Sequence, residues 1–158
     1  MLSTDKKYKV LDLYHGSGRI WNKLKNDGIK FNLTPIDKKN GIDNLKIENL
    51  IDYQKYDIID IDAYGDGIGH FLKIKNKLKN GAIVFITYIN IMGSGCKTTM
   101  DMAGLGEAYK YCRHLTSNKE VALMAFKKIF CGITDNIFFI SPTLKKYYIA
   151  FKIKIIGD

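Results

Sequence analysis

Cysteine, proline and arginine are all scarce in this sequence, and each scarcity excludes a class of structure. The three cysteines, Cys96, Cys112 and Cys131, are odd in number and form no CxxC pair and no Cys/His spacing. They therefore indicate neither a disulfide framework nor a zinc site. No two of the three histidines have the spacing of metal ligands, so we predict that the protein holds no metal.

Only two prolines are present, and no low-complexity stretch suggests a linker. We therefore expect the 158 residues to form one domain covering 1–158. The first residues lack the apolar run of a signal peptide, and no window approaches the roughly 18 apolar residues of a membrane span. With its unpaired thiols, the chain is predicted to be cytoplasmic and to have no membrane partner.

Arginine occurs only as Arg19 and Arg113, although Lys and Arg together number 25 and the net charge is +9. A basic surface suits a polyanionic partner such as RNA or DNA. Arginine, however, is the residue expected where phosphates and guanines are gripped bidentately. A lysine-rich chain is also what an AT-rich gene encodes. Charge alone thus leaves open a basic nucleic-acid-binding module without catalysis.

Strands alternate with helices along most of the chain. The expected strands span 9–14, 31–36, 45–50, 56–62, 82–88, 137–141 and 147–155. The expected helices span 19–26, 68–79, 107–114 and 119–129. Too few residues separate the second and third strands for an ordinary helix, so that helix is predicted to be reduced. The pattern predicts an α/β fold: a doubly wound, mostly parallel sheet of the seven-stranded type, with an antiparallel C-terminal edge turned at 141–143.

A glycine turn follows the first strand, where residues 10–18 read VLDLYHGSG. A strand, a glycine turn and a helix present backbone N–H groups to a nucleotide-like ligand. The third glycine of the dinucleotide fingerprint is Trp21 here, which disfavours NAD or FAD. Asp37, after the second strand, is placed to accept both ribose hydroxyls of an adenosine. Asp12 either orients the turn or binds an ammonium group, which S-adenosylmethionine carries without any phosphate.

A second motif, Asp62-Ala63-Tyr64-Gly65, ends the strand at 56–62. Ligands of such sheets lie beyond the carboxyl ends of the strands. An acidic side chain and the next backbone carbonyl can together accept hydrogen bonds from an exocyclic amine, which holds the nitrogen lone pair toward an electrophilic methyl group. The aromatic ring at Tyr64 can stack on a base. The alternative is a strand-ending turn with a solvated acid and a packed tyrosine.

Together the two motifs resemble those of class I S-adenosylmethionine-dependent methyltransferases that act on amino groups of nucleic acids. Residues 10–18 are similar to the first motif of this family, V-L-D-x-F-x-G-S-G. Residues 57–65, DIIDIDAYG, are similar to its fourth motif, [DN]-P-P-[YF], and most similar to the D-x-D-P-[FY]-G form of tRNA dimethylguanosine methyltransferases. The resemblance implies a Rossmann-like methyltransferase fold with S-adenosyl-L-methionine as cofactor and RNA or DNA as substrate.

The resemblance also implies roles for individual residues. The methionine part of the cofactor would be contacted by Asp12, Tyr14, Gly16 and Gly18. Asp37 corresponds to the acid that binds the ribose, and the adenine-binding position falls near Asn49 or Asp52.

The target amine would be held by Asp62, the Ala63 carbonyl and Tyr64, but Ala63 replaces the family's proline. The rigid backbone that aims the carbonyl is therefore weakened. No separate target-recognition domain is visible, so specificity would come from loops, a protein partner or a homo-oligomer. Two alternatives follow: a protein that degrades S-adenosylmethionine, or a non-catalytic subunit that binds it and activates a partner.

Two further features lie near the predicted site. Residues 93–99, GSGCKTT, resemble a phosphate-binding loop only superficially, and we expect a lid or substrate loop there. His15 lies inside the glycine turn, within reach of cofactor or substrate. We expect His70 and His114 to pack against the core or to lie on helix surfaces.

Overall fold

The computed structural model describes residues 2–37, 49–63, 67–89, 101, 104, 119–143 and 146–154. In chain order the strands are β1 (Lys7–Asp12), β2 (Lys30–Pro35), β3 (Ile58–Ile61), β4 (Ile83–Ile89), β5 (Ile137–Thr143) and β6 (Lys146–Lys152). The α-helices are α1 (Arg19–Asn26), α3 (Gly67–Ile74) and α6 (Lys119–Ile129), and the 3-10 helices are η2 (Tyr53–Lys55) and η3 (Lys75–Lys77). Among these residues, no helix is both long enough and apolar enough to span a bilayer.

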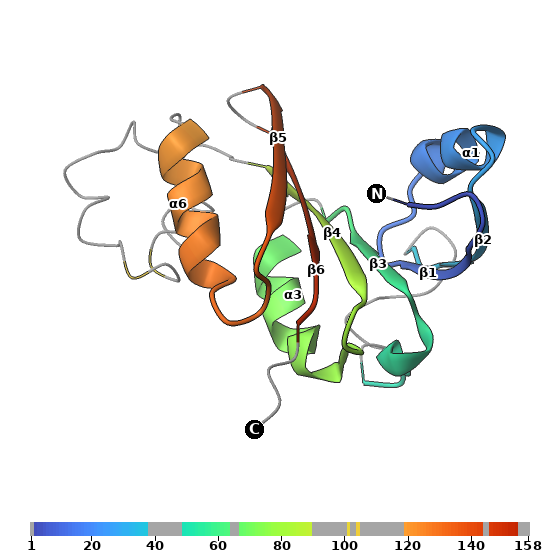
Figure 1. Cartoon of the computed structure of the whole chain (residues 1–158), viewed down its shortest axis with the longest axis horizontal. Coiled ribbons are helices and arrows are strands. Elements are labelled where there is room, and N and C mark those ends of the chain that lie inside the picture. The colour runs from blue at the N-terminus through green and yellow to red at the C-terminus, as the bar shows by residue number, and fades with distance from the viewer. Residues whose placement is uncertain are drawn as a thin grey trace.

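The six strands form one twisted sheet in the order β2-β1-β3-β4-β6-β5 (Figure 1). Strand β1 pairs in parallel with β2 and β3, and β3 pairs in parallel with β4. The C-terminal hairpin adds two antiparallel pairs, with β6 inserted between β4 and β5. The predicted doubly wound sheet with an antiparallel C-terminal edge is confirmed.

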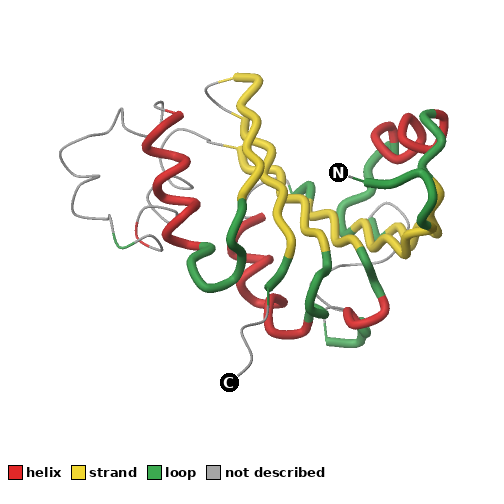
Figure 2. The backbone as a smooth tube through the Cα atoms, viewed as in Figure 1, coloured by secondary structure: helices red, strands yellow, loops and turns green. Residues whose placement is uncertain are grey.

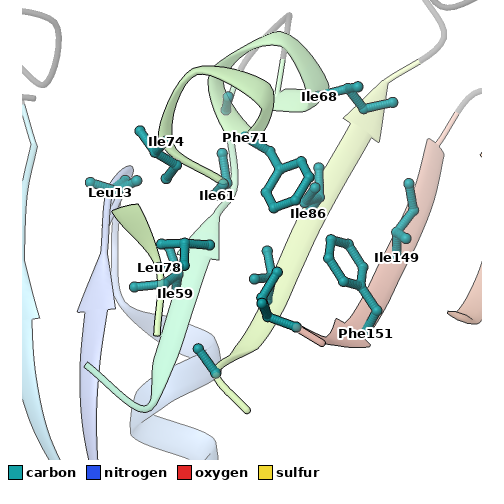
Figure 3. Packing of buried hydrophobic residues seen from close by; sticks show 14 of the residues in the cluster. Leu13, Ile59, Ile61, Ile68, Phe71, Ile74, Leu78, Ile86, Ile149 and Phe151 are labelled. Carbon is teal, nitrogen blue, oxygen red and sulfur yellow. The ribbon is translucent and has the colours of Figure 1, made fainter. Parts of the chain in front are cut away.

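Helices lie on both faces of the sheet, as the tube drawing makes visible (Figure 2). The larger core lies under α3 and α6, where the Phe71 ring meets the rings of Phe130 and Phe151 edge to face, with centroids 5.4 and 5.1 Å away. Figure 3 shows Phe71 of α3 directed toward Ile86 and Phe151 of the strands. Because strand side chains alternate between faces, the residues between these core positions project to the opposite, α1 side.

The smaller core lies on that side of the sheet. There Trp21 of α1 packs with Tyr8 and Val10 of β1 and with Ile58 of β3. The ring of Trp21 also meets Phe31 of β2 edge to face at 5.2 Å. Helix α1 is thereby held over the β2-β1-β3 part of the sheet.

The helices at 19–26 and 119–129 match α1 and α6, but other predicted bounds differ from the structure. The strand at 56–62 is shorter, at Ile58–Ile61, and the strand at 147–155 ends at Lys152. The helix at 68–79 ends at Ile74 and continues only as the 3-10 turn η3. The first strand starts and ends two residues early, at Lys7 and Asp12. The hairpin does not turn at 141–143, because β5 runs on to Thr143 through a register shift after Ile140.

Several predictions concern residues outside the described part of the chain. These are most of the strand at 45–50, the loop at 90–97 and the helix at 107–114. The two described residues of that strand, Asn49 and Leu50, form a turn. The helix between the second and third strands falls on the same undescribed stretch.

Candidate functional site

The glycine turn between β1 and α1 is shaped by two left-handed glycines. Gly16 has φ of +55° and Gly18 has φ of +63°, a region that residues with a side chain rarely adopt. Gly18 precedes the first residue of α1, and a Cβ there would lie 2.6 Å from two atoms of the His15 ring. The turn therefore needs glycine at this position for both its backbone and its packing.

The side chain of Asp12 stabilises the glycine turn through contacts with Tyr14 and His15. Its buried carboxylate accepts the Tyr14 N–H at 3.2 Å through Oδ1, and its Oδ2 lies 2.7 Å from Nδ1 of His15. Because a carboxylate oxygen can only accept, the imidazole Nδ1 carries the hydrogen. Burial raises the pKa of Asp12, although the hydrogen bond and charge of His15 act in the opposite direction. Of the two roles predicted for Asp12, this geometry favours orienting the turn.

Asp37 lies beside the same turn. Its Oδ2 accepts the Gly16 N–H at 2.7 Å, and the His15 N–H donates to the Ile36 carbonyl at 3.2 Å. The end of β2 is thus tied to the glycine turn, and the acid predicted to meet the ribose is brought next to Gly16. Its contact with a ribose stays a prediction.

Three acids share the α1 face of β1 and β3. Asp12 and Asp60 are opposite each other in the parallel register, and Asp62 follows on the same side of the chain. The Trp21 Nε1–H donates to Oδ2 of Asp60 at 3.0 Å. Burial, and then the nearby charges of Asp12 and Asp62, raise the pKa of Asp60 to about 7.

These groups surround a cavity of about 310 Å³ at the carboxyl edge of the sheet. It is lined by Asp12, Tyr14, His15, Gly16, Ser17, Gly18, Arg19, Ile20, Trp21, Asp60 and Asp62. We call it the turn cavity. Among the described residues that line it, Arg19 is the one lysine or arginine, so the cavity suits a ligand with cationic parts and no phosphate. Among the described residues, no group of three or more His, Cys, Asp or Glu side chains has the geometry to hold a metal ion.

Tyr14 links the turn to α3. Its hydroxyl lies 2.9 Å from Nδ1 of His70, and the two rings meet edge to face at 5.7 Å. His70 is buried, so of the two placements expected for it, packing against the core is the one found.

The remaining predicted site residues lie elsewhere. Asn49 is exposed, accepts a hydrogen bond from Lys77 Nζ at 3.0 Å and does not line the turn cavity. Its contact with adenine stays a prediction. Ala63 is buried in the larger core, and Tyr64 is outside the described residues.

Asp60 is the site residue that the sequence reasoning missed. It stands inside a strand, and its signal was the alternation in DIIDID, which puts Asp60 and Asp62 on one face. Trp21 was noted only as a missing glycine, whereas its indole holds the Asp60 carboxylate.

No protein-family model matches the sequence, and no curated protein matches it. Among solved structures, the chain is similar to a candidate S-adenosyl-L-methionine-dependent methyltransferase from Methanococcus maripaludis. The identity is 16% and the TM-score 0.52, over 97% of this chain and 80% of that one.

A candidate exported protein from Bordetella parapertussis has 10% identity and a TM-score of 0.55, over 94% of this chain and 62% of that protein. Identities this low concern the fold alone. The six-stranded mixed sheet with its helices is that of a Rossmann-like methyltransferase fold.

Proposed function

We propose that this chain is an S-adenosylmethionine-dependent methyltransferase that methylates an exocyclic amine of a nucleobase in RNA or DNA. The observation that carries the proposal is the turn cavity. Its three carboxylates, Asp12, Asp60 and Asp62, attract a cation and repel phosphate. The sulfonium and ammonium groups of S-adenosylmethionine meet this requirement, and the fold is one that such enzymes use.

The cofactor would be held by groups on both sides of the glycine turn. The methionine part would lie against Tyr14, Gly16 and Gly18, over the turn that Asp12 orients. The ribose would approach the Asp37 carboxylate, which already accepts the Gly16 N–H. When bound, the cofactor supplies an electrophilic methyl group on its sulfonium.

The acceptor amine would be held at the end of β3. Asp62 lines the turn cavity, and we assign its carboxylate and the Ala63 carbonyl to accept the amine N–H groups. Tyr64 would stack on the base. This arrangement aligns the nitrogen lone pair with the methyl carbon and keeps water away, which is the main task in methyl transfer. Asp60, whose pKa is about 7, is suited to take up the proton that the amine loses.

A second candidate function is cofactor binding without methylation of a base, either by degrading the cofactor or by activating a partner subunit. Ala63 favours this candidate. Its side chain is buried in the core, but it lacks the ring by which a proline would fix the backbone of the amine-binding carbonyl.

Calorimetric titration with S-adenosylmethionine tests the cofactor assignment. Wild-type protein should bind, and Asp37→Ala should weaken binding by roughly tenfold or more, the effect of one lost charged hydrogen bond. Asp135→Ala is the matched control, because Asp135 is exposed and pairs with Lys154 at 2.7 Å. No binding by the wild type, or equal binding by Asp37→Ala, would contradict the assignment.

Transfer of a labelled methyl group from S-adenosylmethionine to RNA and to DNA tests the reaction. Asp62→Ala should abolish transfer while leaving cofactor affinity within a few-fold, because it removes the acceptor of the amine N–H groups and leaves Asp12, Asp37 and the glycine turn in place. Cofactor breakdown in the absence of nucleic acid would favour the second candidate instead.

A further inference from the structure

On the α1 face of the sheet, the side chains change from acidic on β1 and β3 to apolar on β4, β6 and β5. A continuous row crosses five strands in register, and its members are Asp12, Asp60, Phe85, Ala150 and Phe138. The acids at one end belong to the turn cavity. The aromatic and small residues at the other end form an apolar surface on β4, β6 and β5.

The next row continues this surface, with Thr87 opposite Tyr148 and Tyr148 opposite Ile140. Phe138 and Ile140 keep 69% and 65% of their surface exposed, an unusual fraction for large apolar side chains beside a core. Helices α3 and α6 pack on the opposite face, and α1 stands over the β2-β1-β3 part, at the other end of the sheet from β5 (Figure 1). Within the described residues, no helix covers the part of these two rows that lies on β6 and β5.

A second cavity, of about 230 Å³, follows this surface and opens beside the first. It is lined by Ile20, Trp21, Leu24, Asp60, Asp62, Phe85, Ile86, Thr87, Phe138, Ile140, Tyr148, Ile149 and Ala150. We call it the sheet groove. Four of these residues, Ile20, Trp21, Asp60 and Asp62, also line the turn cavity, so the two spaces meet at the end of β3.

Positive charges border the sheet groove on both sides. Alternation along β6 puts Lys146 and Lys152 on the same face as Tyr148, and the Lys146 Nζ lies 4.9 Å from the Tyr148 ring centroid. Across the groove, the exposed Lys23 lies one helical turn from Ile20 on α1. In the described part of the chain, the acids that line the groove are Asp60 and Asp62, at its junction with the turn cavity.

We propose that the sheet groove binds single-stranded nucleic acid, by stacking the bases that flank the target base on Phe138 and Tyr148. Exposed aromatic rings bordered by lysines are the combination that proteins use to hold single strands. The proposal rests on the proposed function, since it supplies the target recognition that the rest of the described chain does not offer. If one base stacked in the sheet groove next to its junction with the turn cavity, the adjacent base in the strand would lie at Asp60 and Asp62. Asp62 is the residue assigned to bind the target amine.

The test is the fluorescence anisotropy of a short labelled single-stranded RNA of mixed sequence, with DNA of the same sequence and its duplex as separate arms. Phe138→Ala and Tyr148→Ala should each weaken single-strand binding roughly tenfold, equivalent to about 1.4 kcal/mol for one lost stack. Tyr148→Phe keeps the ring and should retain binding. Lys146→Ala should reduce the slope of log K against log salt by about 0.7, the value for one phosphate contact.

Met124→Ala is the matched control, because Met124 is 55% exposed on α6, on the opposite face of the sheet. It should leave binding unchanged. Since Phe138 and Tyr148 are exposed, thermal denaturation should confirm that both variants fold normally.

Cofactor titration separates this proposal from the proposed function. If wild-type protein binds S-adenosylmethionine but not the single strands, or if Phe138→Ala and Tyr148→Ala bind them as the wild type does, the groove proposal is wrong while the cofactor part of the proposed function stands. If light scattering instead shows a dimer that these two substitutions dissociate, the groove is an interface between copies, and the proposal is also wrong. If the strands bind in the groove but the cofactor does not bind at all, the proposed function fails alone.

Discussion

Replacing Gly18 with alanine tests how the glycine turn is built. The left-handed backbone at φ of +63° costs an alanine about 1–2 kcal/mol. The new Cβ would also lie 2.6 Å from the His15 ring, so the ring must move away from Asp12. A hydrogen bond to a charged group contributes about 1.5–3 kcal/mol. We therefore expect the free energy of unfolding to fall by about 2.5–5 kcal/mol.

Gly28→Ala is the matched control. Gly28 also has a left-handed backbone, with φ of +85°, but a Cβ there would meet nothing within 4 Å. It should lose only the backbone cost of about 1–2 kcal/mol. Urea denaturation followed by the fluorescence of Trp21, the single and buried tryptophan, measures both losses.

The two contributions can be separated in a His15→Ala background. Without the imidazole, Gly18→Ala should cost no more than Gly28→Ala does. Equal losses for the two glycine variants in the wild-type background would refute the reasoning, because the His15–Asp12 contact would then contribute nothing to the turn.

Three further predictions concern the cavity and the core. The pKa of Asp60 is about 7 in the fold against an ordinary value of 3.8, so between these pH values unfolding releases a proton. The free energy of unfolding therefore falls as the pH rises, by up to about 4 kcal/mol. Urea denaturation at several pH values should show a flatter pH dependence for Asp60→Asn, and an unchanged pH dependence would contradict the assignment. Trp21→Phe removes the indole donor to Asp60 and should cost about 1–2 kcal/mol near neutral pH, measured by circular dichroism. In an Asp60→Ala background, which has no acceptor for the indole, the same substitution should cost less. Phe71→Ala empties a fully buried position against Phe130 and should lower the free energy of unfolding by about 3–5 kcal/mol in the same assay. The exposed Phe138 is the control, and Phe138→Ala should change this free energy by less than about 0.5 kcal/mol. Similar losses for the two variants would mean that Phe138 is not exposed.

The elements that the sequence predicts best are those with local signals at their ends. Helix α1 follows the left-handed Gly18 and closes just before the left-handed Gly28, and its bounds are predicted to the residue. Helix 68–79 has a continuous apolar stripe as far as Leu78, but the chain tightens into a 3-10 turn after Ile74. Its pattern therefore extends beyond the helix, because Leu78 is buried in a different local conformation.

The candidate site is predictable in its glycine turn and its acids but not in their partners. The motif identified Asp12 and Asp37, and the position of each at a strand end brought them to one edge of the sheet. That Asp60 faces Asp12 depends on the register of two strands far apart in the chain, which no local pattern encodes. The same is true of the row from Phe85 to Phe138 and hence of the sheet groove.

The predicted position of the hairpin turn was wrong for a different reason. Ser141-Pro142-Thr143 has the composition of a turn, but proline is tolerated in an edge strand, and β5 is the edge of this sheet. Turn chemistry alone does not distinguish a tight turn from an irregular edge strand. The register shift after Ile140 is how this strand accommodates the segment.

The contact between Tyr14 and His70 joins two segments that are far apart in the sequence. Tyr14 belongs to the glycine turn, and His70 belongs to α3, which begins soon after Asp62. Either segment alone would be a sheet-edge region free to open by local fluctuation, but opening one now deprives the other of a buried partner. The contact therefore couples local opening of the region assigned to the methyl donor to local opening of the region next to the assigned acceptor. The contact that positions the two regions relative to each other is formed within the chain itself and involves no ligand.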